Sequence, residues 1–170
     1  MPSYRDAARI VIGVDPALTS KASSDETGII ICARGVDGCG YVLEDLSCRL
    51  SPEGWARRIV NAYHEFEADR VVAEVNNGGE LVETVLRTID PTLSYKAVHA
   101  SRGKRLRAEP IVSLYEQGKI FHTKPFPELE DQMCNYNPMA YDDSPDRLDA
   151  LVWALTELML GEEPRRIRAW

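Results

Sequence analysis

The order of strand-like and helix-like segments constrains the fold of this 170-residue chain more than any other feature. Three runs rich in β-branched residues come first, and the short turn "VDGCG" separates the second from the third, which favours an antiparallel meander. Helical and strand patterns then alternate, and strands joined through a helix are expected to be parallel with right-handed crossovers. The sequence therefore predicts an α/β fold with one mixed sheet of five or six strands and helices on both faces.

Local signals set the boundaries of these elements. The predicted strands are Arg9–Asp15, Thr27–Arg34, Tyr41–Cys48, Asp69–Val75 and Ser94–Ala100, with a short edge strand at Lys119–His122. The predicted helices begin at Ser51 (an N-cap before Pro52), near Leu81 (ending before Asp90–Pro91), at Lys104 (with Pro110 expected to kink it or delay its start), at Pro127 and at Ser144 or Pro145. The polar segment between Asp15 and Thr27 is expected to form a loop over the strand ends.

Two acidic residues stand at the ends of predicted strands. Asp15 closes "RIVIGVD", and Glu74 lies near the end of the apolar run "VVAEV". If these two strands are neighbours, their carboxylates converge at the carboxyl edge of the sheet, where ligand sites gather in α/β folds. Two such acids repel each other unless a cation lies between them. The alternative for Glu74 is a buried salt bridge to an arginine, and the alternative for Asp15 is a simple Asp-Pro turn.

The last predicted helix, "SPDRLDALVWAL", adds two more carboxylates. Asp146 and Asp149 are three residues apart and share one face of the helix. A favourable interaction with the positive end of the helix dipole accounts for Asp146. It accounts poorly for Asp149, which flanks the apolar stripe that includes Leu148, Leu151 and Val152. We therefore expect Asp149 to be a direct metal ligand. Asp146 is expected to be an auxiliary ligand, a residue that contacts the metal ligands, or only a favourable charge in the first turn.

A site built from Asp15, Glu74 and Asp149, with Asp146 as a further metal ligand, contains only oxygen donors. Such donors suit Mg²⁺ or Mn²⁺. Two ions roughly 3.5–4 Å apart activate water and stabilise the leaving oxygen of a phosphodiester. The residues thus predict a phosphodiester hydrolase in which Asp15, Glu74 and Asp149 are catalytic.

The segments "GVDP", "VVAEVNNGG" and "DRLDALVWAL", in this order and with this strand pattern, resemble the nuclease domain of the large terminase subunit of tailed phages and gene transfer agents. The resemblance runs from Ile10 to about Leu160 and implies a ribonuclease-H-like fold. It matches Asp15, Glu74 and Asp149 to the acids that the family uses, and Asp146 to a variable position. It also implies an endonuclease that cuts concatemeric double-stranded DNA during genome packaging in a bacterial host cell. Its expected partners are a terminase ATPase domain, the small terminase subunit and the portal.

A basic cluster lies between the second and third acids. The stretch from Thr92 to Ala108 has no acid and contains five basic residues: Lys96, Arg102, Lys104, Arg105 and Arg107. Beside a carboxylate site, such a cluster is expected to bind DNA phosphates even though the net charge of the chain is −7. The alternative is a solvated helix face. The family has a lysine and an arginine before a helix in this stretch, and on that basis we expect Lys104 and Arg107 to hold the backbone.

Composition indicates the setting of the protein. The four cysteines have no CxxC spacing, and Cys32 and Cys48 lie in apolar runs, as is typical of buried thiols in a reducing compartment. The N-terminus lacks a signal-peptide core, and no apolar run has the length of a membrane span. We expect a cytoplasmic protein without membrane contact.

The chain is expected to be one nuclease domain over residues 1–170, with a core of about 9–160 and a basic tail, 161–170, that is disordered or contacts DNA or a packaging partner. It has no GxxxxGK[ST] loop, so we expect a nuclease domain cut from a longer terminase or encoded separately. Two other functions stay open. One is a Holliday-junction resolvase of the same fold, and the other is a non-catalytic docking module of a packaging motor.

Overall fold

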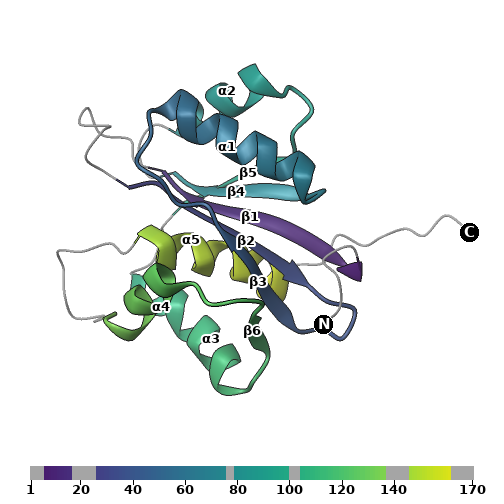
Figure 1. Ribbon diagram of the computed structural model, residues 1–170, viewed down its shortest axis with the longest axis vertical. Coiled ribbons are helices and arrows are strands. Elements are labelled where there is room, and N and C mark those ends of the chain that lie inside the picture. Colours follow the sequence, from purple (N-terminus) through teal and green to yellow (C-terminus); the bar gives the residue numbers. More distant parts are fainter. Residues whose placement is uncertain (1–5, 17–25, 76–78, 100–103, 137–145, 162–170) are drawn as a thin grey trace, which may run out of the picture.

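The computed structural model describes residues 6–16, 26–75, 79–99, 104–136 and 146–161. Its centre is one mixed six-stranded sheet, as the sequence predicts, in the order β5-β4-β1-β2-β3-β6 (Figure 1). The strands are β1 (Arg9–Asp15), β2 (Gly28–Arg34), β3 (Gly40–Asp45), β4 (Arg70–Glu74), β5 (Tyr95–Val98) and β6 (Ile120–His122).

The strand pairing places β1 beside β4. Strands β1, β2 and β3 form the predicted antiparallel meander. The pairs β1–β4, β4–β5 and β3–β6 are parallel, so the carboxyl ends of β1 and β4 lie side by side. Strand β3 ends three residues earlier than predicted, because the Ser47 N–H donates to the Asp45 side chain at 3.0 Å and turns the chain. Cys48 rejoins the sheet through a single bridge to Thr27.

The helices alternate with the strands as the periodicity predicts. They are α1 (Pro52–Glu65), α2 (Gly79–Ile89), α3 (Lys104–Glu116), α4 (Pro127–Cys134) and α5 (Asp146–Leu155), and a π-helical turn (Thr156–Leu160) follows α5. Ser51 caps α1 by accepting the Gly54 N–H at 3.4 Å. Helix α3 begins at Lys104, so Pro110 does not delay its start; Ala108 and Ile111, on either side of Pro110, are buried.

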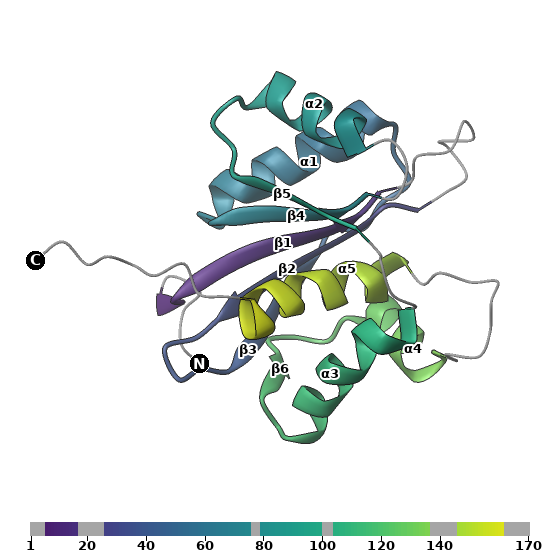
Figure 2. The same ribbon diagram turned by 180° about the vertical axis from the view of Figure 1, so that it is seen from behind.

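Two hydrophobic layers enclose the sheet. Helices α1 and α2 cover one face, where Trp55, Ile59 and Leu86 are buried, and α3, α4 and α5 lie on the other (Figure 2). Successive residues of β1 alternate between the two layers, since Ile12 belongs to the first and Val11 to the second. Both faces are thus buried, which explains why the strand sequences are apolar almost throughout.

Some predictions lie outside the described residues. These are most of the polar loop after Asp15, the start of the last helix at Ser144 or Pro145, Arg102, and the tail beyond Gly161. Among the helices of the described segments, none combines the length and apolar character that crossing a membrane requires.

Candidate metal centre

Three carboxylates from three elements meet at one edge of the sheet. Asp15 is the last residue of β1, Glu74 is the last residue of β4, and Asp149 lies in the first turn of α5. One carboxylate oxygen of each lies within 4.8 Å of the others. Asp15 is half-buried, whereas Glu74 and Asp149 are only 7% and 8% exposed. The structure therefore brings together the three residues that the sequence singled out, which we name the acid triad.

Two glycines let α5 approach the sheet closely enough to complete the acid triad. A Cβ atom on Gly13 of β1 would lie 2.1 Å from the Ala150 carbonyl oxygen, and one on Gly28 of β2 would lie 2.1 Å from the Asp146 carbonyl oxygen. Any larger residue at either place forces the helix away from the strands. Sequence analysis missed this role, although a glycine inside each of two apolar strands is a signal of close backbone approach.

The indole of Trp153 holds one member of the acid triad. Trp153 Nε1 donates a buried hydrogen bond of 3.0 Å to Glu74 Oε2. Trp153 follows Asp149 by four residues, so both side chains project from the same side of α5. The tryptophan is buried, but it also orients a carboxylate.

Arg147 fixes the start of α5. Its Nε lies 2.8 Å from Asp45 Oδ2 at the end of β3, and its guanidinium also pairs with Glu26. In addition, the Leu148 N–H donates to the Gln132 side chain of α4 at 3.1 Å. These contacts join residues far apart in sequence, so no local pattern indicated them.

Asp146 stands apart from the acid triad. It is the first residue of α5 and is half-buried, but it is not one of the three acids whose oxygens lie within 4.8 Å of one another. Its role as an auxiliary metal ligand stays a prediction.

The predicted DNA-binding residues lie in two places. Lys104, Arg105 and Arg107 are in the first turns of α3, and Lys96 is on the edge strand β5. The Lys96 ammonium pairs with Glu157 at 2.9 Å, and its side chain is 46% exposed. The contact of these residues with DNA stays a prediction, as does that of Arg102.

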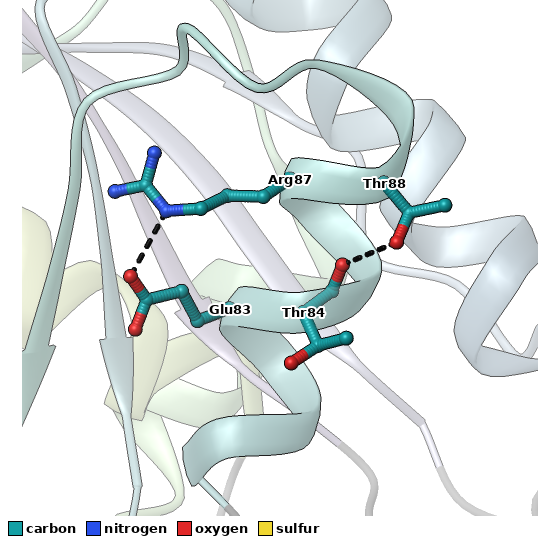
Figure 3. Close-up of a pocket in the computed structure, with 4 residues that line it drawn as sticks. All are labelled: Glu83, Thr84, Arg87 and Thr88. Atoms are coloured by element: carbon teal, nitrogen blue, oxygen red, sulfur yellow. Dashed lines mark hydrogen bonds and ion pairs between the residues drawn. The ribbon is translucent and has the colours of Figure 1, made fainter.

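The pocket of about 470 Å³ in Figure 3 lies elsewhere, on one side of α2. There the Arg87 guanidinium pairs with Glu83 at 2.9 Å, and the Thr88 hydroxyl donates to the Thr84 carbonyl oxygen at 2.7 Å. These bonds join neighbouring turns of α2, so they serve the helix itself.

The acid triad fits a divalent cation. Its donors are carboxylate oxygens, with no histidine or cysteine in the group, which matches the preference of Mg²⁺ and Mn²⁺. Three carboxylates this close repel one another, and two of them are largely withdrawn from water. A cation bound between them would offset both costs. The residues that would hold it are Asp15, Glu74 and Asp149.

Comparison with solved structures supports the same fold. The large terminase nuclease from thermophilic phage G20c with bound zinc superposes with a TM-score of 0.71 at 14% identity, covering 88% of this chain and 81% of that one. The yeast mitochondrial Holliday junction resolvase Ydc2 gives 0.57 at 9% identity, covering 91% and 80%. Thermus thermophilus RuvC gives 0.56 at 15% identity, covering 88% and 93%. At such identities the likeness is one of fold, and it confirms the expected ribonuclease-H-like architecture.

A search among curated protein sequences found no match. A family model, described as the Terminase RNaseH-like domain, matches residues 12–158. The matched range contains all three carboxylates of the acid triad and confirms the resemblance that the sequence motifs indicated. The chain therefore belongs to the terminase RNaseH-like domain family.

Proposed function

We propose that this chain is a divalent-metal-dependent endonuclease that cuts concatemeric double-stranded DNA during genome packaging. The observation that carries the proposal is the meeting of Asp15, Glu74 and Asp149, from β1, β4 and α5, within 4.8 Å. Membership of the terminase RNaseH-like domain family supports the nuclease assignment. Structures of the G20c terminase nuclease with bound zinc, cobalt and magnesium show that a protein of this fold binds divalent metals.

We assign Mg²⁺ or Mn²⁺, most simply two ions, to the acid triad with Asp146 as auxiliary ligand. Bound there, the ions would supply an activated water and charge stabilisation for a phosphodiester. The residues of the chain supply the metal ligands and hold them in place. The three carboxylates come from rigid elements, and the Trp153 indole N–H fixes the orientation of Glu74.

We assign the DNA backbone to the basic residues before and within α3. Lys104 and Arg107 would hold phosphates, with Arg102, Arg105 and Lys96 contributing to the same path. A local cluster of this kind does not require a positive net charge, which is −7 for the whole chain. In this proposal the domain spans residues 1–170, with a core of about 9–160, and works with a terminase ATPase domain, the small terminase subunit and the portal.

Plasmid cleavage tests the proposal. Incubation with Mg²⁺ or Mn²⁺ is expected to cut supercoiled DNA with little sequence preference, and EDTA is expected to stop the reaction. Cutting that persists in EDTA would contradict the metal mechanism. Absence of cutting under all metals would favour the docking-module alternative.

A Holliday-junction resolvase is the second candidate, because the fold is also shared with Ydc2, RuvC and the fowlpox virus resolvase. A synthetic four-way junction and a linear duplex of the same sequence separate the two functions. A packaging nuclease is expected to cut both at similar rates. Paired, symmetrical cuts in the junction alone would favour the resolvase.

A further inference from the structure

A second charged cluster lies at the far end of the helix that carries Asp149. Glu157, in the π-helical turn after α5, is only 8% exposed. Its Oε1 lies 3.2 Å from the Arg9 guanidinium and 3.0 Å from the Arg70 guanidinium, and its Oε2 lies 2.9 Å from the Lys96 ammonium. We name Glu157, Arg9, Arg70 and Lys96 the Glu157 cluster.

The Glu157 cluster joins the same elements that form the acid triad. Arg9 is the first residue of β1, the strand that ends with Asp15. Arg70 is the first residue of β4, the strand that ends with Glu74. Because α5 begins over Gly28, beside the carboxyl end of β1, and is followed by Glu157 beside Arg9, it runs antiparallel to β1. The elements β1, β4 and α5 therefore carry the acid triad at one end and are joined by the Glu157 cluster at the other.

The contacts along α5 differ in how strongly they fix its position. Between its ends, α5 rests on the strands through small and apolar side chains, such as Ala154 against Gly13, and through the hydrogen bond from Trp153 to Glu74. Apolar contacts set the distance between helix and sheet, but they have little directionality. Ion pairs with hydrogen-bond geometry do have direction. Arg147 supplies them at the start of α5, and Glu157 supplies them after its end.

The backbone at the end of α5 is adapted to this contact. Thr156–Leu160 form a π-helical turn, which is wider than an α-helical turn and is frequent at functional sites. The next residue, Gly161, lies so close to the backbone of Glu157 that a Cβ atom on it would be 2.5 Å from the Glu157 carbonyl oxygen. The chain therefore departs from regular helix at the place where Glu157 contacts both strands.

The charges favour an ionised Glu157. Burial by itself raises the pKa of this carboxyl, but the hydrogen bond from Lys96 and the positive charges of Lys96, Arg9 and Arg70 outweigh it, so the pKa lies below its usual value. A charged carboxylate with three cationic partners is costly to move, because a shift of the helix leaves the buried carboxylate of Glu157 unpaired.

We infer that Glu157 is a positioning residue for the metal centre: by binding Arg9 of β1 and Arg70 of β4, it sets the register of α5 on the sheet and so holds Asp149 opposite Asp15 and Glu74. The inference rests on the proposed metal-dependent function of the acid triad. Glu157 itself lies about two helical turns from Asp149 and acts through the helix rather than on the metal.

Thermal unfolding under metal titration tests the inference without measuring activity. The stability gained from Mn²⁺ or Mg²⁺ follows RT ln(1 + [metal]/Kd), so the metal concentration at which the gain equals RT ln 2, here called the metal midpoint, reports the metal affinity of the folded protein. Glu157→Gln keeps the shape of the side chain but removes its charge. We expect the midpoint to move to a metal concentration roughly fivefold higher or more, the size of a typical coupling between two sites.

Asp90→Asn is the matched control. Asp90 is also 8% exposed and binds His64 at 2.7 Å and the Thr92 hydroxyl at 2.7 Å, on the α1–α2 side of the sheet. Both substitutions remove a buried carboxylate that side chains of other residues bind, so both are expected to lower Tm in EDTA. Only Glu157→Gln is expected to change the metal midpoint. An equal change, or none, in the two variants would overturn the inference.

Two milder variants keep the test decisive if Glu157→Gln does not fold. Arg70→Gln leaves Glu157 with Arg9 and Lys96, and is expected to shift the midpoint in the same direction by less. Glu157→Asp retains the charge on a shorter side chain, which draws the carboxylate away from Arg9 and Arg70, and is expected to raise the metal midpoint above the wild-type value by less than a loss of the charge would. Unchanged midpoints in Arg70→Gln and Glu157→Asp would refute the positioning role. A wild-type protein whose Tm does not respond to metal would instead refute the proposed function.

Discussion

Asp149 is buried although its side chain is a carboxyl group, and its neighbours in space are two further acids. We predict that Asp149→Asn abolishes metal-dependent cleavage and leaves Tm in EDTA equal or higher, because one of three repelling charges is gone. Asp146→Asn, one turn earlier, is expected to reduce cleavage less or to shift its metal dependence. Plasmid assays and thermal unfolding in EDTA measure both effects.

Asp131→Asn serves as the control for these two changes, since Asp131 is an exposed acid on α4. It should alter neither cleavage nor Tm appreciably. Near-normal cleavage by Asp149→Asn, or its unfolding in EDTA, would mean that Asp149 is structural and serves mainly to complement the helix dipole.

Trp153 offers a second test at a single residue. Trp153→Phe removes the indole N–H that donates to Glu74 Oε2 while keeping an aromatic ring in the core. We predict that the metal midpoint rises about tenfold, the usual effect of losing a group that orients a ligand. Metal titration monitored by Tm measures this change.

Trp55→Phe is its matched control. Trp55 is fully buried, and its indole nitrogen has no hydrogen-bond acceptor among the described residues. The substitution removes the same atoms from the core without removing a bond to a carboxylate. A metal midpoint that moved equally in both variants would show that packing, and not the bond to Glu74, is responsible.

Among the elements, α5 packs directly against the backbone of β1 because Gly13 has no side chain. We predict that Gly13→Ala destabilises the fold by about 1–3 kcal/mol through overpacking and weakens metal binding by displacing α5. Chemical denaturation and metal titration check the two effects. Gly38→Ala is the control: its Cβ would meet nothing within 4 Å, but its φ of +81° costs about 1 kcal/mol. It should leave the metal midpoint unchanged.

The Glu157 cluster also predicts a pH dependence for the attachment of the π-helical turn. The pKa of Glu157 is lowered, so its contribution to stability is fully present above the usual glutamate pKa of about 4.3 and is lost as the pH falls through the lower, folded value. The Tm difference between wild type and Glu157→Gln is thus expected to be constant near neutral pH and to shrink in acid. Glu53→Gln, an exposed residue paired with Arg57, should show little difference at any pH.

At the scale of the whole molecule, the net charge is negative and repels DNA, whereas the residues of the proposed DNA path are positive and attract it. We predict that Lys104→Ala combined with Arg107→Ala weakens DNA binding and lowers the slope of log affinity against log salt by roughly 0.9 for each phosphate that the variant no longer neutralises. Binding measured in Ca²⁺ or EDTA over a salt series tests this.

A pair of arginines elsewhere gives the control. Arg57 and Arg58 are exposed on α1, which covers the opposite face of the sheet from α3. Their double alanine variant removes the same charge from the molecule. An equal loss of affinity and slope in both double variants would attribute DNA binding to overall charge rather than to α3.

Local patterns in the sequence predict the strands, their order along the chain and the three acids of the candidate site. Apolar runs such as "RIVIGVD" and "VVAEV" are local patterns, and a helix between two strands makes them parallel, which brings their carboxyl ends to one edge. The convergence of Asp15 and Glu74 follows from that rule once β1 and β4 are neighbours. The burial of Asp149 follows from its place beside the apolar stripe of its helix.

The attachment of α5 to the sheet depends on contacts that no local pattern shows. The approach at Gly13, the bond from Trp153 to Glu74, and the pairing of Glu157 with Arg9 and Arg70 all join residues that are far apart in the chain. A periodic pattern shows which face of a helix is buried, but it does not show at which position along the strands the helix is held. Directional bonds between side chains far apart in the sequence set that position, and these bonds form only when the helix packs against the strands.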